Sequence, residues 1–225
     1  MFTKHRLFQG AVILTAAGLI SRLMGFFFRI FLSHAFGEES VGLYQLIFPV
    51  YALCLSVSTA GLQTAVSRMT AEKVSRGQKE EAGNVLRIAL CLTLIVSLAE
   101  VLLIQQNASF IAETFLGDPR CAEMLVIISY ALPCAAVHSC ICGYSFGMQR
   151  TELPAISQLV EQAARILFVV LLFIFMKDTG RVPSIRLAAA GIAAGEFVSA
   201  VFSSKMLSAQ KPFCRVPSLA SVSRN

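Results

Sequence analysis

The 225-residue sequence contains no tryptophan, and only 14% of its residues are charged. Hydrophobic residues make up 56% of the chain, and its mean hydropathy is +0.71. A chain with this composition cannot bury its apolar side chains in a soluble globular domain. The sequence therefore predicts an all-α integral membrane protein, with the lipid bilayer as its surroundings.

Motifs for nucleic-acid binding, catalysis and metal binding are also missing. The net charge is +6, but the basic residues form no patch with interleaved aromatic residues, so we expect no nucleic-acid partner. No segment carries a His-Glu-x-x-His run or a Ser/His/Asp set, and we expect neither an enzyme nor a cofactor. The seven cysteines lack the paired spacing of zinc ligands and predict small core residues. We expect no metal, because His138 and Cys140 diverge on a helix.

Six apolar segments are long enough to cross a bilayer as helices of about 20 residues each. The first continues well past Gly18, which favours an uncleaved span over a signal peptide. Together they predict one six-helix transmembrane lobe over residues 1–208. The predicted spans cover roughly residues 10–33, 43–68, 86–106, 122–147, 154–176 and 186–207.

The distribution of lysine and arginine predicts the orientation of these spans. Most of the 19 basic residues lie in the N-terminus, in the connections 68–87 and 148–153, and in the tail. The positive-inside rule then places both termini in the cytoplasm, although the loop 177–186 fits this orientation least well. Residues 209–225 lack periodicity and predict a disordered cytoplasmic tail.

Two arginines inside the first span are the main functional clue. An arginine at a bilayer centre costs roughly 2.5–3.5 kcal/mol, so it usually faces a bundle interior or a water-filled cavity. At about 100° per residue, both arginines share one stripe with small and hydroxyl residues. The alternatives are a structural ion pair and snorkelling of the second arginine to the nearer interface. The stripe consists of Thr15, Gly18, Arg22, Gly25, Arg29 and Ser33.

The second span repeats this pattern without charge. Its polar and small residues line one helical face, which together with the arginines would form a hydrophilic interior. Packing of these residues against another helix is the alternative. Proline within the span predicts a kink, because it removes an intrahelical hydrogen bond. The stripe consists of Gln45, Pro49, Ala52, Ser56, Thr59, Gln63 and Ser67.

The fifth span begins near Pro154, where the missing N–H of a proline is harmless. Glu161 and Arg165 follow at a spacing of four residues, in the favourable order for an ion pair. Gln158 flanks the same face. These polar groups predict either part of a cavity or a pair that only joins two helices.

The sixth span is rich in small residues. Gly191 and Gly195 have the spacing that lets two membrane helices pack closely. The acidic Glu196 follows directly. We expect it to pair with an arginine elsewhere in the bundle, either Arg22 or Arg29.

Four segments carry a resemblance to a known family: residues 20–34, 37–51 and 60–68, and the motifs within 147–165. They resemble the N-terminal part of the stage V sporulation protein B family, which belongs to the polysaccharide and oligosaccharidyl-lipid exporters. The resemblance covers roughly residues 8 to 207. One motif departs from it, because the family usually has Arg-Gly-Tyr-Phe-Gln-Gly-Met where this chain has Cys-Gly-Tyr-Ser-Phe-Gly-Met at residues 142–148.

The resemblance implies one lobe of a fold like that of the multidrug-and-toxin exporters and the lipid II flippase. It also implies a flippase or exporter in a bacterial cytoplasmic membrane. The cargo would be a lipid-linked oligosaccharide or polysaccharide precursor of the undecaprenyl-pyrophosphate type, for cell-wall or spore-cortex peptidoglycan. The cavity residues it implies are Arg22, Arg29, Gln45, Gln63, Gln158, Glu161 and Arg165.

Members of this family have two such lobes, so the resemblance implies that a second lobe or a second copy completes the transporter. The unfamiliar tail suggests a truncation or a frameshift. Two alternatives remain open. One is a lobe of a cation-coupled multidrug exporter, with Glu161 or Glu196 as its acidic site. The other is a non-transporting membrane subunit or an inert fragment.

Overall fold

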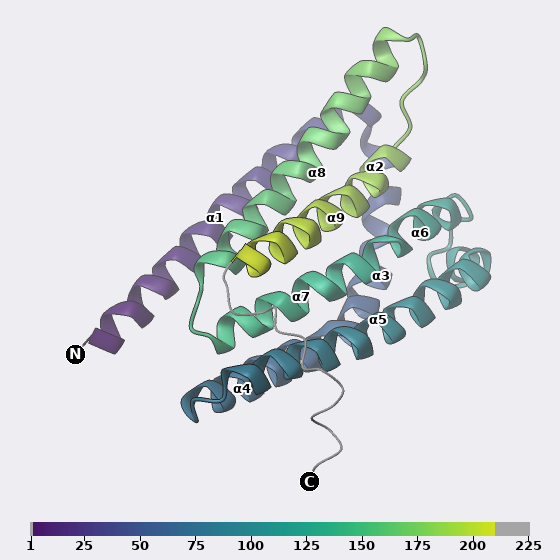
Figure 1. Cartoon of the computed structure of the whole chain (residues 1–225). Helices are drawn as coiled ribbons and strands as arrows, with labels where there is room; N and C mark the ends of the chain where they lie inside the picture. The colour runs from purple at the N-terminus through teal and green to yellow at the C-terminus, as the bar shows by residue number, and fades with distance from the viewer. Residues whose placement is uncertain (1, 210–225) are drawn as a thin grey trace.

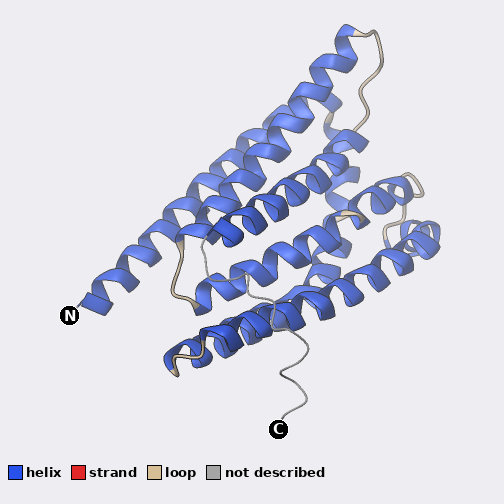
Figure 2. Cartoon of the chain, in the orientation of Figure 1, coloured by secondary structure: helices blue, strands red, loops and turns tan. Residues whose placement is uncertain are grey.

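The computed structural model describes residues 2–209. This part of the chain consists of helices joined by short turns and loops (Figure 2). The predicted tail lies almost wholly outside the described residues. The helices are α1 (Phe2–Phe36), α2 (Glu38–Leu46), α3 (Phe48–Leu55), α4 (Gly61–Ser75), α5 (Lys79–Phe110), α6 (Cys121–Ser129), α7 (Ala131–Gly147), α8 (Glu152–Asp178) and α9 (Arg186–Ala209), with π-helical segments η1 (Ser56–Ala60) and η2 (Ile111–Phe115).

The described helices confirm an all-α membrane protein with the predicted spans. Five stretches are long and apolar enough to cross a membrane, and α6 with α7 makes a sixth if the bent pair is one span. The second stretch runs from Glu38 to Ser75 and so includes four consecutive elements. The bend between α6 and α7 is 40° and was not predicted from the sequence.

Pro49 interrupts the second span, as predicted. It lies in the first turn of α3, directly after the break at Ile47. A proline is tolerated there because the first N–H groups of a helix have no intrahelical acceptor. The span is broken again by η1, where the hydrogen bonding widens from an i+4 to an i+5 pattern. Pro154 also lies in the first turn of its helix, α8.

The helices form a splayed bundle in which α8 packs between α1 and α9 (Figure 1). The other side of α9 packs on α7, and α7 in turn contacts α4 and α5. The α4–α5 and α7–α8 connections lie at the end where α1 begins, and the α8–α9 loop lies at the opposite end (Figure 1). The connections between spans therefore alternate between the two ends of the bundle, as the predicted order of spans requires. The orientation of the lobe in a membrane stays a prediction.

Glycines bring two pairs of helices into close contact. A Cβ atom at Gly195 would lie 2.9 Å from the carbonyl oxygen of Glu161, and one at Gly191 would clash with the Val169 side chain. The predicted close packing of α9 is therefore confirmed, and its partner is α8. A second contact, between α4 and α7, was missed: a Cβ at Gly147 would lie 2.6 Å from the Ser67 carbonyl oxygen.

The two glycines of the arginine stripe differ from each other. At Gly25, a Cβ would lie 3.3 Å from the Nε2 atom of Gln162, so α1 and α8 approach each other there. At Gly18, no atom of the described chain lies within 4 Å of a Cβ position. The structure therefore shows a tight contact at Gly25 and none at Gly18.

Ion pairs connect the loops at the end of the bundle that carries the α8–α9 loop. Arg120 donates hydrogen bonds to Asp118 at 2.8 Å and to Glu39 at 2.9 Å. The hydrogen bonds from Arg120 to Asp118 hold the pKa of Asp118 below its usual range, because they stabilise the charged carboxylate. Arg186 pairs with Glu123 nearby. Apart from the half-buried Asp118, the side chains of these three pairs are exposed, so each pair contributes little to stability.

We predict that Gly147→Ala destabilises the lobe, because the added methyl group would overlap the Ser67 carbonyl and push α4 away from α7. Overpacking of this kind costs about 1–3 kcal/mol. The measurement is thermal unfolding of the purified chain in detergent. Gly18→Ala is the matched control and should leave the unfolding temperature unchanged or slightly higher. Equal unfolding temperatures for the two variants would contradict the assigned contact.

Candidate functional site

Arg22 and Arg29 both lie on an exposed face of α1. The helix packs through a neighbouring face, where Ala17, Phe28 and Leu32 are buried. Within the described part of the chain, neither arginine forms a hydrogen bond or an ion pair. Two cationic side chains in one membrane span therefore have no acidic partner inside this lobe.

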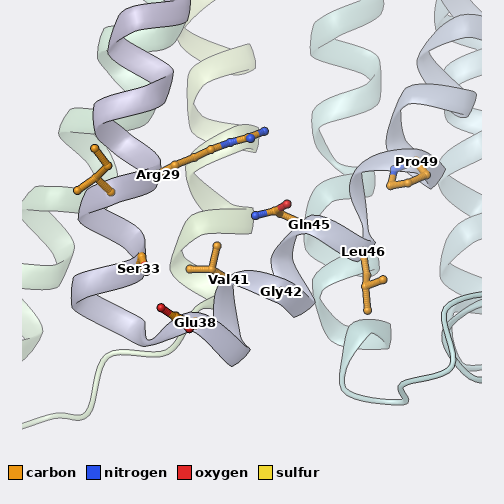
Figure 3. Close-up of a pocket in the computed structure, with 9 residues that line it drawn as sticks. Arg29, Ser33, Glu38, Val41, Gly42, Gln45, Leu46 and Pro49 are labelled. Carbon is orange, nitrogen blue, oxygen red and sulfur yellow. The ribbon is translucent and has the colours of Figure 1, made fainter.

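Arg29 points into a groove between α1 and the first half of the second span (Figure 3). The groove has a volume of about 650 Å³. The Gln45 side chain points into the same space from α2, opposite Arg29 (Figure 3). The groove is lined by Arg29, Ile30, Ser33, Glu38, Val41, Gly42, Gln45, Leu46 and Pro49.

This lining combines one positive charge, on Arg29, and one negative charge, on Glu38, with polar and apolar side chains. Arg29 and Gln45 can both donate hydrogen bonds into the groove, and Ile30 and Leu46 add apolar surface. Arg22 does not line the groove, but it lies two turns away on the same face of α1, at about 1.5 Å per residue. The arrangement suits a ligand that has an anionic group next to an apolar part.

The predicted ion pair between Glu161 and Arg165 is present on α8. The Nη2 atom of Arg165 lies 2.5 Å from the Oε1 atom of Glu161, and the two side chains are only 16% and 18% exposed. The Nε atom of Arg165 is buried without a partner among the described residues. Because Arg165 pairs with Glu161, most of its charge is compensated within the lobe. The charges of the two arginines on α1 are not compensated in this way.

The expected partner of Glu196 was wrong. Glu196 accepts a hydrogen bond of 3.1 Å from the Tyr51 hydroxyl group and faces the Nδ1 atom of His138 at 3.9 Å. It does not pair with Arg22 or Arg29, because α1 packs chiefly on α8. Glu196 instead points to the side where α9 meets α3 and α7.

Two further predicted residues have different surroundings. Gln63 is half-buried and accepts a hydrogen bond of 3.3 Å from the Ser139 hydroxyl group, so it joins α4 to α7. Gln158 is exposed on α8. A role in cargo binding stays a prediction for both glutamines.

Sequence reasoning missed two polar contacts inside the bundle. His138 lies with Glu161 and Glu196 in one cluster, and Ser58 in η1 hydrogen-bonds to Glu100 on α5. The sequence did contain a sign of these contacts, because single ionisable residues within apolar spans are rare and often functional. Their partners are distant in sequence, so the signal could mark the residues without pairing them.

A family model described as "Polysaccharide biosynthesis protein" matches residues 7–224. The chain belongs to this family. Stage V sporulation protein B of Bacillus subtilis (strain 168) is 34% identical over 203 residues, which cover 88% of this chain and 38% of that protein. Lipid II flippase MurJ of the same organism is 28% identical over 171 residues, covering 72% of this chain and 31% of that protein.

A third relative in this comparison is the uncharacterized membrane protein YabM of Bacillus subtilis (strain 168), 22% identical over 198 residues. No solved structure matches the chain significantly. The chain spans between 31% and 38% of the length of the curated relatives it matches. The family assignment agrees with the resemblance found in the sequence motifs.

We predict that the Glu161–Arg165 pair couples more strongly than a solvent-exposed pair of the same kind. Glu72 and Arg76 form such a pair, with the same spacing and order, but their side chains are 53% and 62% exposed. Double-mutant cycles with Gln in place of each residue, followed by unfolding in detergent, measure both couplings. We expect about 1–3 kcal/mol for the buried pair and about 0.5 kcal/mol or less for the exposed pair. Equal couplings would show that burial adds nothing to the pair on α8.

Proposed function

We propose that this chain forms one lobe of a flippase that moves lipid-linked oligosaccharide or polysaccharide precursors across a bacterial cytoplasmic membrane. Such precursors carry an undecaprenyl-pyrophosphate anchor, and the pathway would be synthesis of cell-wall or spore-cortex peptidoglycan. Membership in the polysaccharide biosynthesis family supports this proposal, as does the similarity to a protein named lipid II flippase. The proposed activity is transport and not catalysis.

The observation that carries the proposal is the pair of unpartnered arginines on one face of α1. An unpaired cation within a membrane span is expensive, so such a residue faces a polar cavity or a counter-charge. Since neither Arg22 nor Arg29 forms an ion pair within the described part of the lobe, an anionic cargo is a suitable partner. A guanidinium group suits phosphate because its donors form a planar fork.

The groove then provides the binding place for the anionic group. Arg29 would hold a phosphate oxygen, and the side-chain amide of Gln45 would donate a second hydrogen bond from the opposite wall. Glu38 lies on the same lining and would repel a second phosphate at that position. In this proposal the polyprenyl tail stays in the lipid.

A second lobe would close the cavity on the side where the arginines are exposed. The groove between Arg29 and Gln45 belongs to a single lobe, and the match covers 38% of the length of stage V sporulation protein B. In transporters built of two related lobes, rocking of one lobe against the other exposes the central site to each side in turn. The second lobe would be the rest of a longer chain, a separate chain or a second copy.

We predict that Arg29→Gln weakens binding of undecaprenyl pyrophosphate to the purified chain in detergent. Loss of a hydrogen bond to a charged group costs about 1.5–3 kcal/mol, which corresponds to a decrease in affinity of about 10- to 150-fold. The measurement is binding of a labelled undecaprenyl pyrophosphate. Arg29→Lys should retain part of the affinity, because lysine keeps the charge and loses the fork.

The control for this experiment is Arg76→Gln. Arg76 directly follows α4, pairs with Glu72 in the last turn of that helix, and lies outside the groove. Its substitution should leave the affinity unchanged. If Arg29→Gln and Arg76→Gln bind undecaprenyl pyrophosphate equally well, the groove is not the anion site.

The need for a second lobe predicts the size of the assembled protein. The chain has a mass of 24.4 kDa, and native mass spectrometry of the material extracted from its own cells should show a species of at least twice that mass. The excess mass would come from a longer form of this chain, from a partner chain or from a second copy. A lone chain of 24.4 kDa would rule out autonomous transport, because the cavity would have only one wall.

A further inference from the structure

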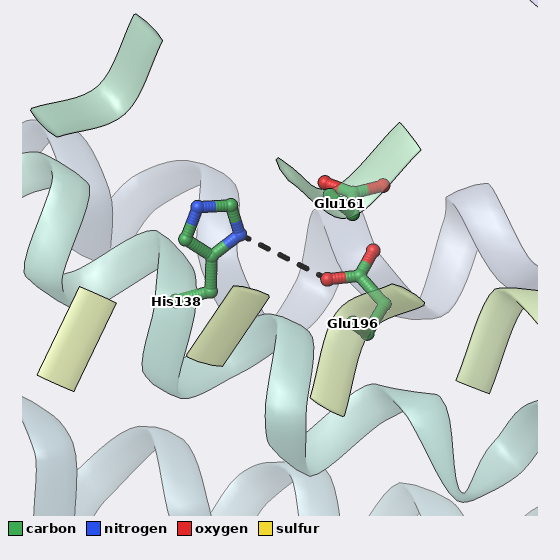
Figure 4. Close-up of side chains that lie close together, drawn as sticks. All are labelled: His138, Glu161 and Glu196. Atoms are coloured by element: carbon green, nitrogen blue, oxygen red, sulfur yellow. Dashed lines mark ion pairs between the residues drawn. The ribbon is translucent and has the colours of Figure 1, made fainter. Parts of the chain in front are cut away.

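His138, Glu161 and Glu196 bring three side chains with metal-ligating atoms together from three different helices. The residues lie on α7, α8 and α9, and their side chains point toward one another (Figure 4). One ligand atom from each lies within 4.8 Å of the other two. The sequence prediction of no metal site considered only neighbours along α7 and could not include the two glutamates.

The hydrogen bonds of the imidazole ring leave its Nδ1 atom free to act as a ligand. The Nε2 atom lies 2.9 Å from the Ser157 hydroxyl oxygen, and that hydroxyl group donates its own proton to the Pro154 carbonyl at 3.0 Å. With its proton on that carbonyl bond, the hydroxyl group accepts from the ring, which corresponds to the tautomer with a proton on Nε2. In the neutral ring, Nδ1 then has a lone pair, which it directs at Glu196 (Figure 4).

Each carboxylate is held through one of its oxygens. Tyr51 donates to Oε1 of Glu196, and Arg165 donates to Oε1 of Glu161. All three side chains thus have an outer partner that fixes their direction: a serine, a tyrosine and an arginine. Outer partners of this kind orient the ligands in protein metal sites.

The distances leave a gap at the centre of the cluster. Nδ1 of His138 and Oε2 of Glu196 are 3.9 Å apart, whereas a direct charge-assisted hydrogen bond is about 2.7–2.9 Å long. A tetrahedral zinc ion with bonds of about 2.0–2.2 Å holds two ligand atoms about 3.3–3.6 Å apart. The three ligand atoms lie within 4.8 Å of one another, so binding would draw them together by up to about an ångström.

We propose that His138, Glu161 and Glu196 bind a divalent transition-metal ion such as Zn²⁺. One imidazole nitrogen and two carboxylate oxygens are a ligand set that suits these ions. Arg165 pairs with Glu161, whereas Glu196 has no lysine or arginine partner among the described residues, so a bound cation would compensate its charge. His138 and Glu196 are 13% and 9% exposed, which shields a bound ion from water. The ion would join α7, α8 and α9, and the proposal does not depend on the transport function.

The test is titration of the purified, chelator-treated chain in detergent with Co²⁺, followed by visible absorption and calorimetry. We expect one equivalent of Co²⁺ per chain, displaced by Zn²⁺. His138→Gln and Glu196→Gln should each abolish this binding. His34→Gln is the matched control, because His34 is exposed near the end of α1 and should not affect binding.

Ser157→Ala provides a second test that keeps every ligand in place. It removes the group that orients the ring through Nε2, and loss of such an outer partner weakens metal binding about 10- to 100-fold. If His138→Gln does not fold, this variant decides the question. Absence of stoichiometric Co²⁺ binding would overturn the proposal. Equal binding by Ser157→Ala and the parent chain, or by the variants of His138 and His34, would also overturn it.

Discussion

The constraint on which this lobe depends is that a polar group inside an apolar bundle must find a partner. Burying an unpaired polar or charged group costs several kcal/mol, and no water is present in a bilayer core to offset that cost. Inside the bundle, the ionisable residues have partners on other helices or one turn away, as in the pairs Tyr51–Glu196 and Glu161–Arg165. The two arginines on α1 are the contrast, and this contrast is why we assign them to an anionic cargo.

Close helix contacts put these polar partners within reach of one another. Gly195 lets α9 approach the backbone of α8 at Glu161. The next residue, Glu196, is thereby held close to the carboxylate of Glu161 and to the His138 ring on α7. A bulkier residue at position 195 would separate α8 from α9 and open the cluster. Small residues that seem to serve only packing therefore also determine the geometry of the buried charges.

The predicted polar stripe of the second span does not continue along its whole length, because the span is not one regular helix. Gln45 and Pro49 line the groove, as a regular helix would place them. The chain then passes through η1, where a π-turn inserts about one extra residue and rotates all later side chains by about 100°. Gln63, beyond this segment, contacts Ser139 on α7 instead of continuing the stripe. A period counted along the sequence cannot detect such a change of phase.

The sequence by itself determined the membrane class, the approximate spans, the break at Pro49 and the ion pair of Glu161 with Arg165. These features depend on composition and on contacts within four residues, which hydropathy and helical periodicity describe directly. Only the tertiary structure decided which helices are neighbours. It paired Glu196 with Tyr51 and His138 in place of an arginine, and it left Arg22 and Arg29 exposed. The reason is physical: contacts between distant segments depend on where α1, α8 and α9 pack, and periodicity along one helix carries no information about its neighbours.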